Sequence, residues 1–347
     1  MNFDNYSCDN QMNLFDFTRE PINITKPIRL IELFAGYGSQ AMALKRIGAK
    51  FEHYRVVEFD KYAIASYNAV HGTDFPTMDI TKVHAYDLNI CDTDAFTYLL
   101  TYSFPCTDLS VAGKQAGMSK GSGTRSGLLW EVERILTEIR DSNGELPQIL
   151  FMENVPQVHS QDNMPDFRKW LDFLESLGYT NYYQDLNAKN YGVAQNRERC
   201  FMFSFLVEYN YHFPQPIPLK KKIQDYLEKN VTEKFYVSNK ALKGFMEHAK
   251  KQKEKGNGFG AVAKDVDDIS STITARYYKD GSDCLIKVDG KIRKLTPREC
   301  GRLMSVSDED ITKMKAVNSN THLYKQFGNS IVVDVMCAMF KNLNINQ

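Results

Sequence analysis

The segment Phe104-Pro105-Cys106 places a thiol directly after an apolar stretch. Residues 99–104 are expected to form a buried strand, and α/β enzymes place reacting groups at the carboxyl ends of such strands. A cysteine thiolate is a strong nucleophile, and nearby positive charge increases the ionised fraction. The Gly- and Ser-rich stretch at 107–127 predicts a loop that closes over the site. A buried structural cysteine is the alternative interpretation of Cys106.

Two further segments carry charge beside apolar strands. Glu153 follows four apolar residues at 149–152, so burial is expected to raise its pKa and keep it protonated near neutral pH. Arg197 and Arg199 lie two positions apart in an expected extended segment and therefore point to the same side. There they suit a phosphate or a base carbonyl. A capping carboxylate and a surface salt-bridge ladder are the alternatives.

A third segment has the pattern of a nucleotide-binding turn. Residues 32–39 read Glu-Leu-Phe-Ala-Gly-Tyr-Gly-Ser, which predicts a strand, a Gly-x-Gly turn and the start of a helix. Glu58 ends the next expected strand, where an acid accepts hydrogen bonds from ribose hydroxyls. Asp79 and Ile80 are candidates for an adenine edge. Ala41 replaces the last glycine of the dinucleotide fingerprint, which disfavours NAD. A tight turn without a ligand is the alternative.

These groups together fit one reaction. Addition of a thiolate to C6 of a cytosine makes C5 nucleophilic enough to accept a methyl group. An acid at the ring nitrogen and arginines at the carbonyl would assist that addition, and the nucleotide-like pocket would hold the methyl donor.

The bulk composition describes an ordinary globular chain. Its 347 residues are 43% hydrophobic and 25% charged, and the length suggests about two domains. The 43 Lys and Arg balance the 43 Asp and Glu, which restricts nucleic-acid contact to local patches. No apolar run approaches the roughly 20 residues of a membrane span, and no signal-peptide pattern begins the chain. The 7 scattered cysteines form no CxxC pair, so we expect no metal and no disulfide framework, and a cytoplasmic, reducing location.

Alternating strand and helix patterns begin at Ile28 and predict a mostly parallel, doubly wound α/β sheet. We expect strands at 28–34, 55–58, 99–104, 149–152 and 200–206, and helices at 40–47, 62–70 and 167–177. Prolines at 214, 216 and 218 mark a change of texture, followed by short β-rich pieces at 235–237, 271–274 and 284–288. The expected organisation is a loosely held polar leader (1–27), a first domain (28–212 plus 320–347) and a second, smaller domain (213–319). An apolar helix at 331–340 is expected to pack on the first domain.

From Ile28 onward the sequence resembles the cytosine-C5 DNA methyltransferase family. The segments that carry the resemblance follow that family's order: Phe34-Ala35-Gly36-Tyr37-Gly38, Pro105-Cys106, Glu153-Asn154-Val155, Gln195 to Arg199, Arg293 to Met304, and Gly328-Asn329-Ser330-Ile331.

The resemblance implies a Rossmann-like methyltransferase sheet, a target-recognition domain and hinge at 213–319, and S-adenosylmethionine as cofactor. It implies that Cys106 is the nucleophile, Glu153 contacts N3 and N4 of a flipped cytosine, Arg199 reaches O2 and Arg197 supports the site. The implied cofactor contacts are Phe34, Ala35, Gly36, Gly38, Glu58, Phe59, Asp79, Ile80, Pro105, Leu128, Asn329 and Ser330. Two departures from the family pattern are Ser39, where glycine is usual, and Thr107, where glutamine is common.

The implied partner is double-stranded DNA, bound by a monomer in a restriction-modification or phage-protection setting beside a companion restriction endonuclease. Candidate DNA contacts are Lys114, Arg125, Arg276 and Tyr277, with Lys120 and Lys220–Lys222 as further phosphate contacts. The alternatives are methylation of RNA such as tRNA, a non-catalytic DNA-binding regulator, and a nucleotide-binding oxidoreductase. The long stretch between Tyr211 and Arg293 favours DNA, and the presence of Cys106 and Glu153 disfavours a regulator.

Overall fold

The computed structural model describes residues 20–109, 116–207, 209–254, 263–282 and 284–345. Its centre is a six-stranded sheet in the order β3-β2-β4-β5-β7-β6. The strands are β2 (Ile28–Leu33), β3 (Phe51–Val57), β4 (Thr97–Tyr102), β5 (Ile149–Asn154), β6 (Thr180–Asn187) and β7 (Glu198–Phe205). β3, β2, β4 and β5 pair in parallel, whereas β7 is antiparallel to both β5 and β6. The mostly parallel α/β sheet expected from the sequence is confirmed.

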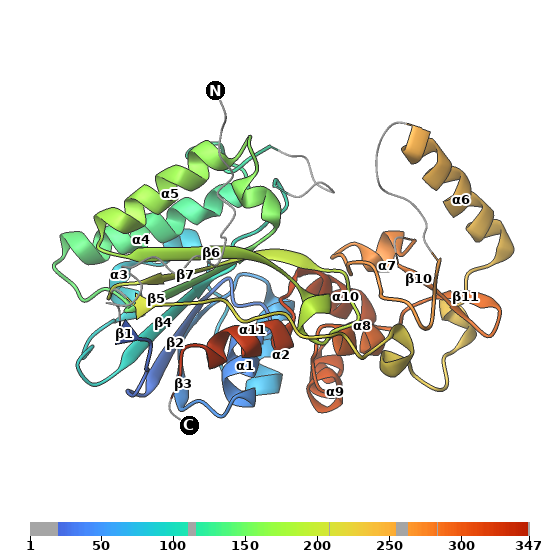
Figure 1. Cartoon of the computed structure of the whole chain (residues 1–347), viewed down its shortest axis with the longest axis horizontal. Helices are drawn as coiled ribbons and strands as arrows, with labels where there is room; N and C mark the ends of the chain where they lie inside the picture. Colours follow the sequence, from blue (N-terminus) through green and yellow to red (C-terminus); the bar gives the residue numbers. More distant parts are fainter. Residues whose placement is uncertain (1–19, 110–115, 208, 255–262, 283, 346–347) are drawn as a thin grey trace.

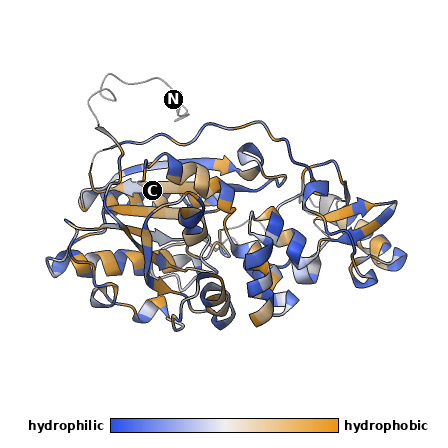
Figure 2. Ribbon diagram, turned by 90° about the horizontal axis from the view of Figure 1, so that it is seen from below, coloured by the Kyte–Doolittle hydropathy of each residue, from blue (hydrophilic) through white to orange (hydrophobic). Residues whose placement is uncertain are grey.

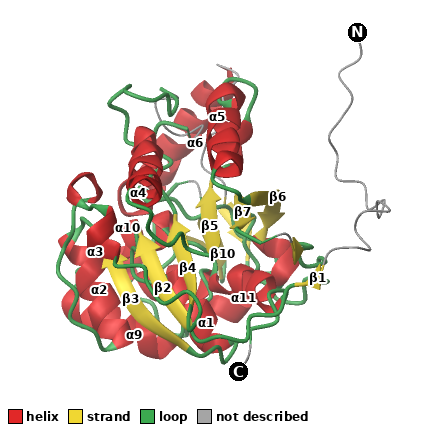
Figure 3. Ribbon diagram, turned by 90° about the vertical axis from the view of Figure 1, so that its left-hand side faces the viewer, coloured by secondary structure: helices red, strands yellow, loops and turns green. Residues whose placement is uncertain are grey.

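Helices cover both faces of the sheet (Figure 3). α4 (Leu129–Asp141) and α5 (Met164–Ser176) lie on one face, and α1 (Ser39–Arg46) and α11 (Val333–Lys341) lie on the other. Every residue of β4 and β5 is buried, as expected for strands covered on two sides. The hydrophobic residues concentrate on the central strands, and the outer faces of the helices are hydrophilic (Figure 2).

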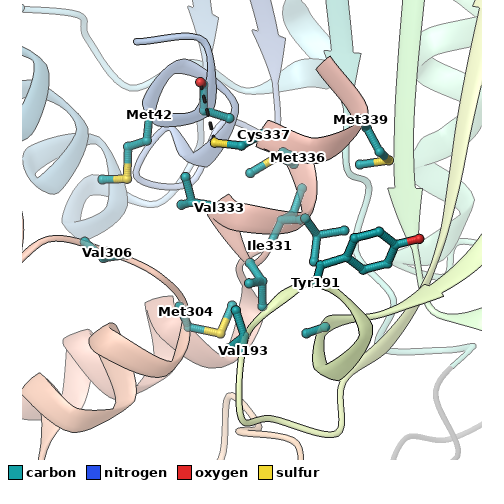
Figure 4. Close-up of a cluster of buried hydrophobic side chains, with 14 of the residues drawn as sticks. Met42, Tyr191, Val193, Met304, Val306, Ile331, Val333, Met336, Cys337 and Met339 are labelled. Atoms are coloured by element: carbon teal, nitrogen blue, oxygen red, sulfur yellow. Dashed lines mark hydrogen bonds between the residues drawn. The ribbon is translucent and has the colours of Figure 1, made fainter. Parts of the chain in front are cut away.

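The expected apolar helix near the C-terminus packs on the first helix of the chain. α11 contributes Val333, Met336 and Cys337 to a buried cluster that also contains Met42 of α1 (Figure 4). The thiol of Cys337 points at the carbonyl of Ala43, 3.7 Å away. Helix α11 therefore covers the same face of the sheet as α1, the helix that follows the Gly-rich turn.

The remaining helices surround the sheet or build a second unit. α2 (Lys61–His71) packs against α9 (Asp308–Val317), and α3 (Ala85–Leu88) packs against α4. α8 (Pro297–Leu303) and α10 (Asn320–Asn329) lie between the sheet and the second unit (Figure 1). No helix in the described ranges is long and apolar enough to span a membrane.

The second unit is built on a small sheet in the order β11-β10-β9. β9 (Ala263–Asp265), β10 (Leu285–Val288) and β11 (Lys291–Lys294) carry α6 (Asn239–Glu254) and α7 (Tyr277–Asp280) at their side. Asp289 and Gly290 both have positive φ and form the tight turn between β10 and β11. The β-rich piece expected at 284–288 is confirmed. The piece expected at 235–237 is confirmed in part: Phe235 ends a 3-10 helix, but Tyr236 forms a β-bridge with Arg293 of β11 and the amide of Val237 donates to the carbonyl of Ile292. The piece expected at 271–274 is wrong, because these residues have no regular structure.

The prediction that residues 1–27 form a loosely held leader is wrong for the end of this segment. Ile22 and Ile24 are 2% and 4% exposed, and Ile24 forms a β-bridge with Ile345. Pairing of β1 (Glu20–Pro21) with β8 (Tyr209–Asn210) holds this segment against the body of the protein. The two isoleucines remove apolar surface from water, which outweighs the polar composition around them. Residues 1–19 lie outside the described residues.

Candidate active site

Cys106 lies just past the end of β4, and its position is fixed from the neighbouring strand. Asn154, the last residue of β5, donates a hydrogen bond to the carbonyl of Phe104 at 3.0 Å. Because Asn154 is 1% exposed, this bond forms where water does not compete for it. The carboxyl ends of β4 and β5 are therefore tied together at the segment that carries the thiol.

The far end of the Gly-rich loop is fixed at the same place. The hydroxyl of Ser126 donates to the carbonyl of Pro105 at 2.7 Å and accepts from the amide of Asp108 at 3.2 Å. The carboxylate of Asp108 accepts from the amide of Arg125 at 2.8 Å. These bonds close a loop whose two ends meet beside Cys106. Asn154, which the sequence pattern includes beside Glu153, takes this supporting role, whereas Asp108 and Ser126 were not predicted, because short polar side chains in a Gly- and Ser-rich loop carry no distinctive pattern.

Glu153 and Arg199 form an ion pair next to the thiol. The Nε of Arg199 lies 3.2 Å from Oε1 of Glu153, and both side chains are largely buried. Burial raises the pKa of Glu153, and the charges of Arg199 and Arg197 oppose that rise. The direction agrees with the sequence prediction of a carboxyl that holds its proton above the usual range.

The same charges act on Cys106. Burial raises the pKa of its thiol, Arg199 lowers it, and Glu153 raises it further. The thiol is therefore mostly protonated at neutral pH in this arrangement, and Arg199 is the first of the groups that favour the thiolate.

Arg197 binds backbone carbonyls, whereas Arg199 pairs with Glu153. Its side chain is 3% exposed and donates to the carbonyls of Ile273 at 2.9 Å and Gly328 at 3.1 Å, and also to that of Ser330. Burial, with the neighbouring Arg199, lowers its pKa to about 9. The guanidinium holds three carbonyls from two backbone segments that are distant in sequence, so Arg197 is a positioning residue rather than a group that faces an open site.

The Gly-rich turn has the backbone that its glycines predict. Phe34, Gly36 and Gly38 have φ of 59°, 58° and 80°. A Cβ added at Gly38 would lie 2.4 Å from Nε2 of His71, so no other residue fits there. A Cβ at Gly36 would meet nothing within 4 Å, which leaves open space above the turn. Glycine at 36 is therefore required by conformation, and its open side is free for a ligand.

Glu58 is tied to this turn. One carboxylate oxygen accepts from the amide of Gly36 at 2.8 Å and the other accepts from the amide of Asp60 at 2.7 Å. Burial raises the pKa of Glu58, and the two amides oppose that rise. Glu58 thus links the ends of β2 and β3 across the turn.

The other expected cofactor contacts surround the same edge of the sheet. The Phe59 side chain is 76% exposed, and Asp79 begins a short 3-10 helix at Ile80 by accepting from the amide of Thr81. The half-buried Phe34 and Leu128 pack against the hydrophobic cluster that contains Ile80. Ala35 is buried and Pro105 is half-buried, while Asn329 is exposed at the end of α10.

A specific contact explains why serine stands at position 39, where the family usually has glycine. Its hydroxyl hydrogen-bonds to the hydroxyl of Ser330, and Ser39 is 3% exposed. The substitution therefore adds a direct link between the first helix and the segment after α10.

The residues expected to contact DNA differ in their exposure to solvent. Arg125 and Arg276 are exposed, whereas Tyr277 is 2% exposed and belongs to the core. The Tyr277 hydroxyl donates to the carbonyl of Cys284 and accepts from the amide of Leu295. Its assignment to DNA is therefore wrong, because a buried ring with a satisfied hydroxyl cannot reach a groove. Lys120 is held in an ion pair with Glu133 at 2.9 Å, and Lys114 lies outside the described residues.

Comparison with known proteins identifies the family and the fold. The family model described as C-5 cytosine-specific DNA methylase matches residues 28–344. The Type II methyltransferase M2.ScrFI of Lactococcus lactis subsp. cremoris is 34% identical, and the match covers 92% of this chain and 100% of that protein. The Type II methyltransferase M.HhaI of Haemophilus parahaemolyticus is also 34% identical, covering 91% and 94%. The structure of the Entamoeba histolytica methyltransferase EhMeth has a TM-score of 0.72 at 17% identity, covering 92% of this chain and 98% of that one, which shows the shared fold.

Proposed function

The chain belongs to the C-5 cytosine-specific DNA methylase family and is a DNA cytosine-C5 methyltransferase, and we propose that it acts through a covalent bond between Cys106 and C6 of a flipped cytosine. The single observation that carries the proposal is the grouping of Cys106 after the carboxyl end of β4, Glu153 at the carboxyl end of β5, and Arg199 at the amino end of the antiparallel strand β7. C6 is unreachable inside a stacked duplex, so the base must leave the helix before the thiolate can attack.

We propose S-adenosylmethionine as the methyl donor. The open space above Gly36, the Glu58 carboxylate at the end of β3 and the exposed Phe59 ring fit a nucleoside with a ribose diol and a flat base. Phe34, Ala35, Gly38, Asp79, Ile80, Pro105, Leu128, Asn329 and Ser330 are the further contacts of this proposal. When bound, the cofactor supplies an electrophilic methyl group.

The chain's own residues prepare the cytosine. Cys106 adds to C6 as the thiolate, which the charge of Arg199 favours. Glu153, whose raised pKa keeps a proton available, stabilises the charge that develops at N3. Arg199 is suited to contact O2, and Arg197 holds the carbonyls of Gly328 and Ser330 in place behind it. After methyl transfer a base removes the C5 proton, and Cys106 leaves.

We propose double-stranded DNA bound between the two units, with residues 213–319 as the target-recognition domain and hinge. The exposed side chains of Arg125 and Arg276 are candidate contacts, and Lys114 remains one by its place in the loop. We further propose a monomer in the cytoplasm, paired with a restriction endonuclease, which the names of the Type II relatives support.

Duplex DNA with 5-fluorocytosine at the target position tests the chemistry, because fluorine at C5 blocks the final proton removal. We expect the wild-type chain and cofactor to form a covalent adduct that peptide mass spectrometry places on Cys106. Cys106→Ser should form no adduct while it retains duplex binding, because a hydroxyl is far less ionised than a thiol near neutral pH. An adduct on Cys91 or Cys200, or an adduct formed by Cys106→Ser, would overturn the proposal.

A further inference from the structure

Three side chains of metal-ligating type converge outside the proposed catalytic group. His159 ends the 3-10 helix η4 (Pro156–His159), Asp185 lies on β6 and Cys200 lies on β7. Asp185 and Cys200 are direct partners in the β6–β7 ladder. The Nε2 of His159 lies 2.9 Å from Oδ1 of Asp185, and the ligand atoms of all three residues lie within 4.8 Å of one another.

These side chains carry the groups that a cation needs. The Cys200 thiol is fully buried and hydrogen-bonds to the carboxyl of Asp185, which also pairs with the imidazole of His159. One sulfur, one oxygen and one nitrogen therefore lie together at one place.

The geometry also leaves a route for an ion. The side chains of His159 and Asp185 are 25% and 30% exposed, while Cys200 closes the site from the protein interior. An ion can thus reach the site from solvent, and a zinc ion with three protein ligands takes water as its fourth ligand.

We propose that His159, Asp185 and Cys200 bind one Zn²⁺ ion, with water as the fourth ligand. One sulfur, one nitrogen and one oxygen suit zinc, whereas magnesium and calcium select oxygen ligands alone. The thiolate and the carboxylate together balance the charge of the ion. Binding forms the Zn–S and Zn–N bonds and releases the thiol proton and any imidazolium proton to solvent.

The proposed zinc site lies next to Glu153 and Arg199, the residues proposed to contact the cytosine. Cys200 follows Arg199 in β7 and pairs with Asn154 of β5, which follows Glu153. η4 begins two residues after Asn154 and carries His159. An ion here joins η4 to strands β6 and β7. It thereby makes β5 and β7, the strands that carry Glu153 and Arg199, more rigid. Cys200 belongs to the buried cluster that also contains Phe167 and Trp170 of α5, so the ion would lie on the sheet face that α5 covers and its role is structural.

Metal content of the full-length, untagged protein tests the site independently of methyl transfer. After chelator treatment, the chain is dialysed against Zn²⁺ and its zinc is counted by plasma mass spectrometry; a parallel sample is titrated with Co²⁺. We expect one zinc per chain and a thiolate-to-cobalt charge-transfer band in the near ultraviolet. Cys200→Ser should lose the band, and Cys91→Ser, the matched control, should retain it.

His159→Gln provides a second variant at a partly exposed side chain, whose ring contacts Phe167 and Tyr183. It should lower zinc occupancy at least tenfold at limiting Zn²⁺, while circular dichroism shows a folded chain. Absence of zinc and of the charge-transfer band in the folded wild-type chain would overturn the proposal. So would equal zinc occupancy in the wild type and His159→Gln. Because no readout involves DNA or cofactor, these results are distinguishable from failure of the methyl-transfer mechanism.

Discussion

The guanidinium of Arg199 contacts the carboxyl of Glu153, with Nε 3.2 Å from Oε1, and its charge also acts on the thiol of Cys106. One arginine thus lowers the pKa of two groups, a thiol that must lose its proton in the proposed mechanism and a carboxyl that must keep one. It favours the thiolate that attacks and at the same time limits how far burial raises the pKa of the acid.

Removal of this charge should shift the reactivity of the thiol. In Arg199→Gln we expect the pKa of Cys106 to rise, because an opposing positive charge is lost from a largely buried site. The rate of iodoacetamide labelling at Cys106, measured by peptide mass spectrometry across pH, should move to higher pH. Arg140→Gln, at the end of α4, is the control. An unchanged midpoint in Arg199→Gln would show that the arginine does not act on the thiol.

Cofactor affinity should depend on Glu58. Glu58→Ala removes the proposed ribose contact and also the bonds to the amides of Gly36 and Asp60, so binding should weaken by about 2–4 kcal/mol. Isothermal titration calorimetry with S-adenosylmethionine measures the loss. Glu52→Ala, at the other end of β3, should bind as the wild type does. Equal affinity in the two variants would remove Glu58 from the cofactor site.

DNA binding should depend on salt through Arg125 although the net charge is zero. Its exposed side chain lies at the base of the loop beside Cys106, where the backbone of a bound duplex would pass. Arg125→Ala should reduce the slope of log affinity against log salt by about one. Fluorescence anisotropy at several salt concentrations gives the slope, with Arg140→Ala as control. If both variants keep the wild-type slope, the loop base does not contact phosphate.

Stability should fall as pH rises, because of Glu32. This carboxyl is fully buried in β2 and accepts from the hydroxyl of Tyr67, and burial raises its pKa to about 8. The folded chain therefore binds a proton that the unfolded chain has released. The stabilising contribution is fully present below the usual carboxyl range and is lost as pH rises through about 8.

Urea unfolding across this range measures the effect, on the order of a few kcal/mol. Glu32→Gln keeps the size of the side chain but cannot ionise, so its free energy of unfolding should decline much less with pH. Parallel curves for the wild type and Glu32→Gln would exclude Glu32 as the titrating group.

Much of the site was predictable because its chemistry is local in sequence. The turn at Gly36 and Gly38 follows from glycines, which adopt its positive φ values most readily, and the order of the motifs was sufficient to indicate the methyltransferase family. The strands β2, β4 and β5 followed from short apolar runs whose two faces both need cover. These features depend on near neighbours in the chain, which the sequence displays directly.

Other features depended on which distant segments meet. Tyr277 reads as an exposed aromatic beside Arg276, yet helix formation turns its ring into the core beneath Leu295. Arg197 and Arg199 look equivalent as alternate residues, but Gly328 and Ser330 approach only Arg197 and fix it as a positioning residue.

The cluster of His159, Asp185 and Cys200 shows the same limit most clearly. Its members are separated by 26 and 15 positions, far from any spacing that identifies a metal site in a sequence. The sequence by itself determined the family and the sheet and predicted Cys106 as the nucleophile, because their signals reside in single short segments. Only the tertiary structure decided which side chains share a site, because the register of β6 on β7 and the return of η4 against them bring together residues that no local pattern connects.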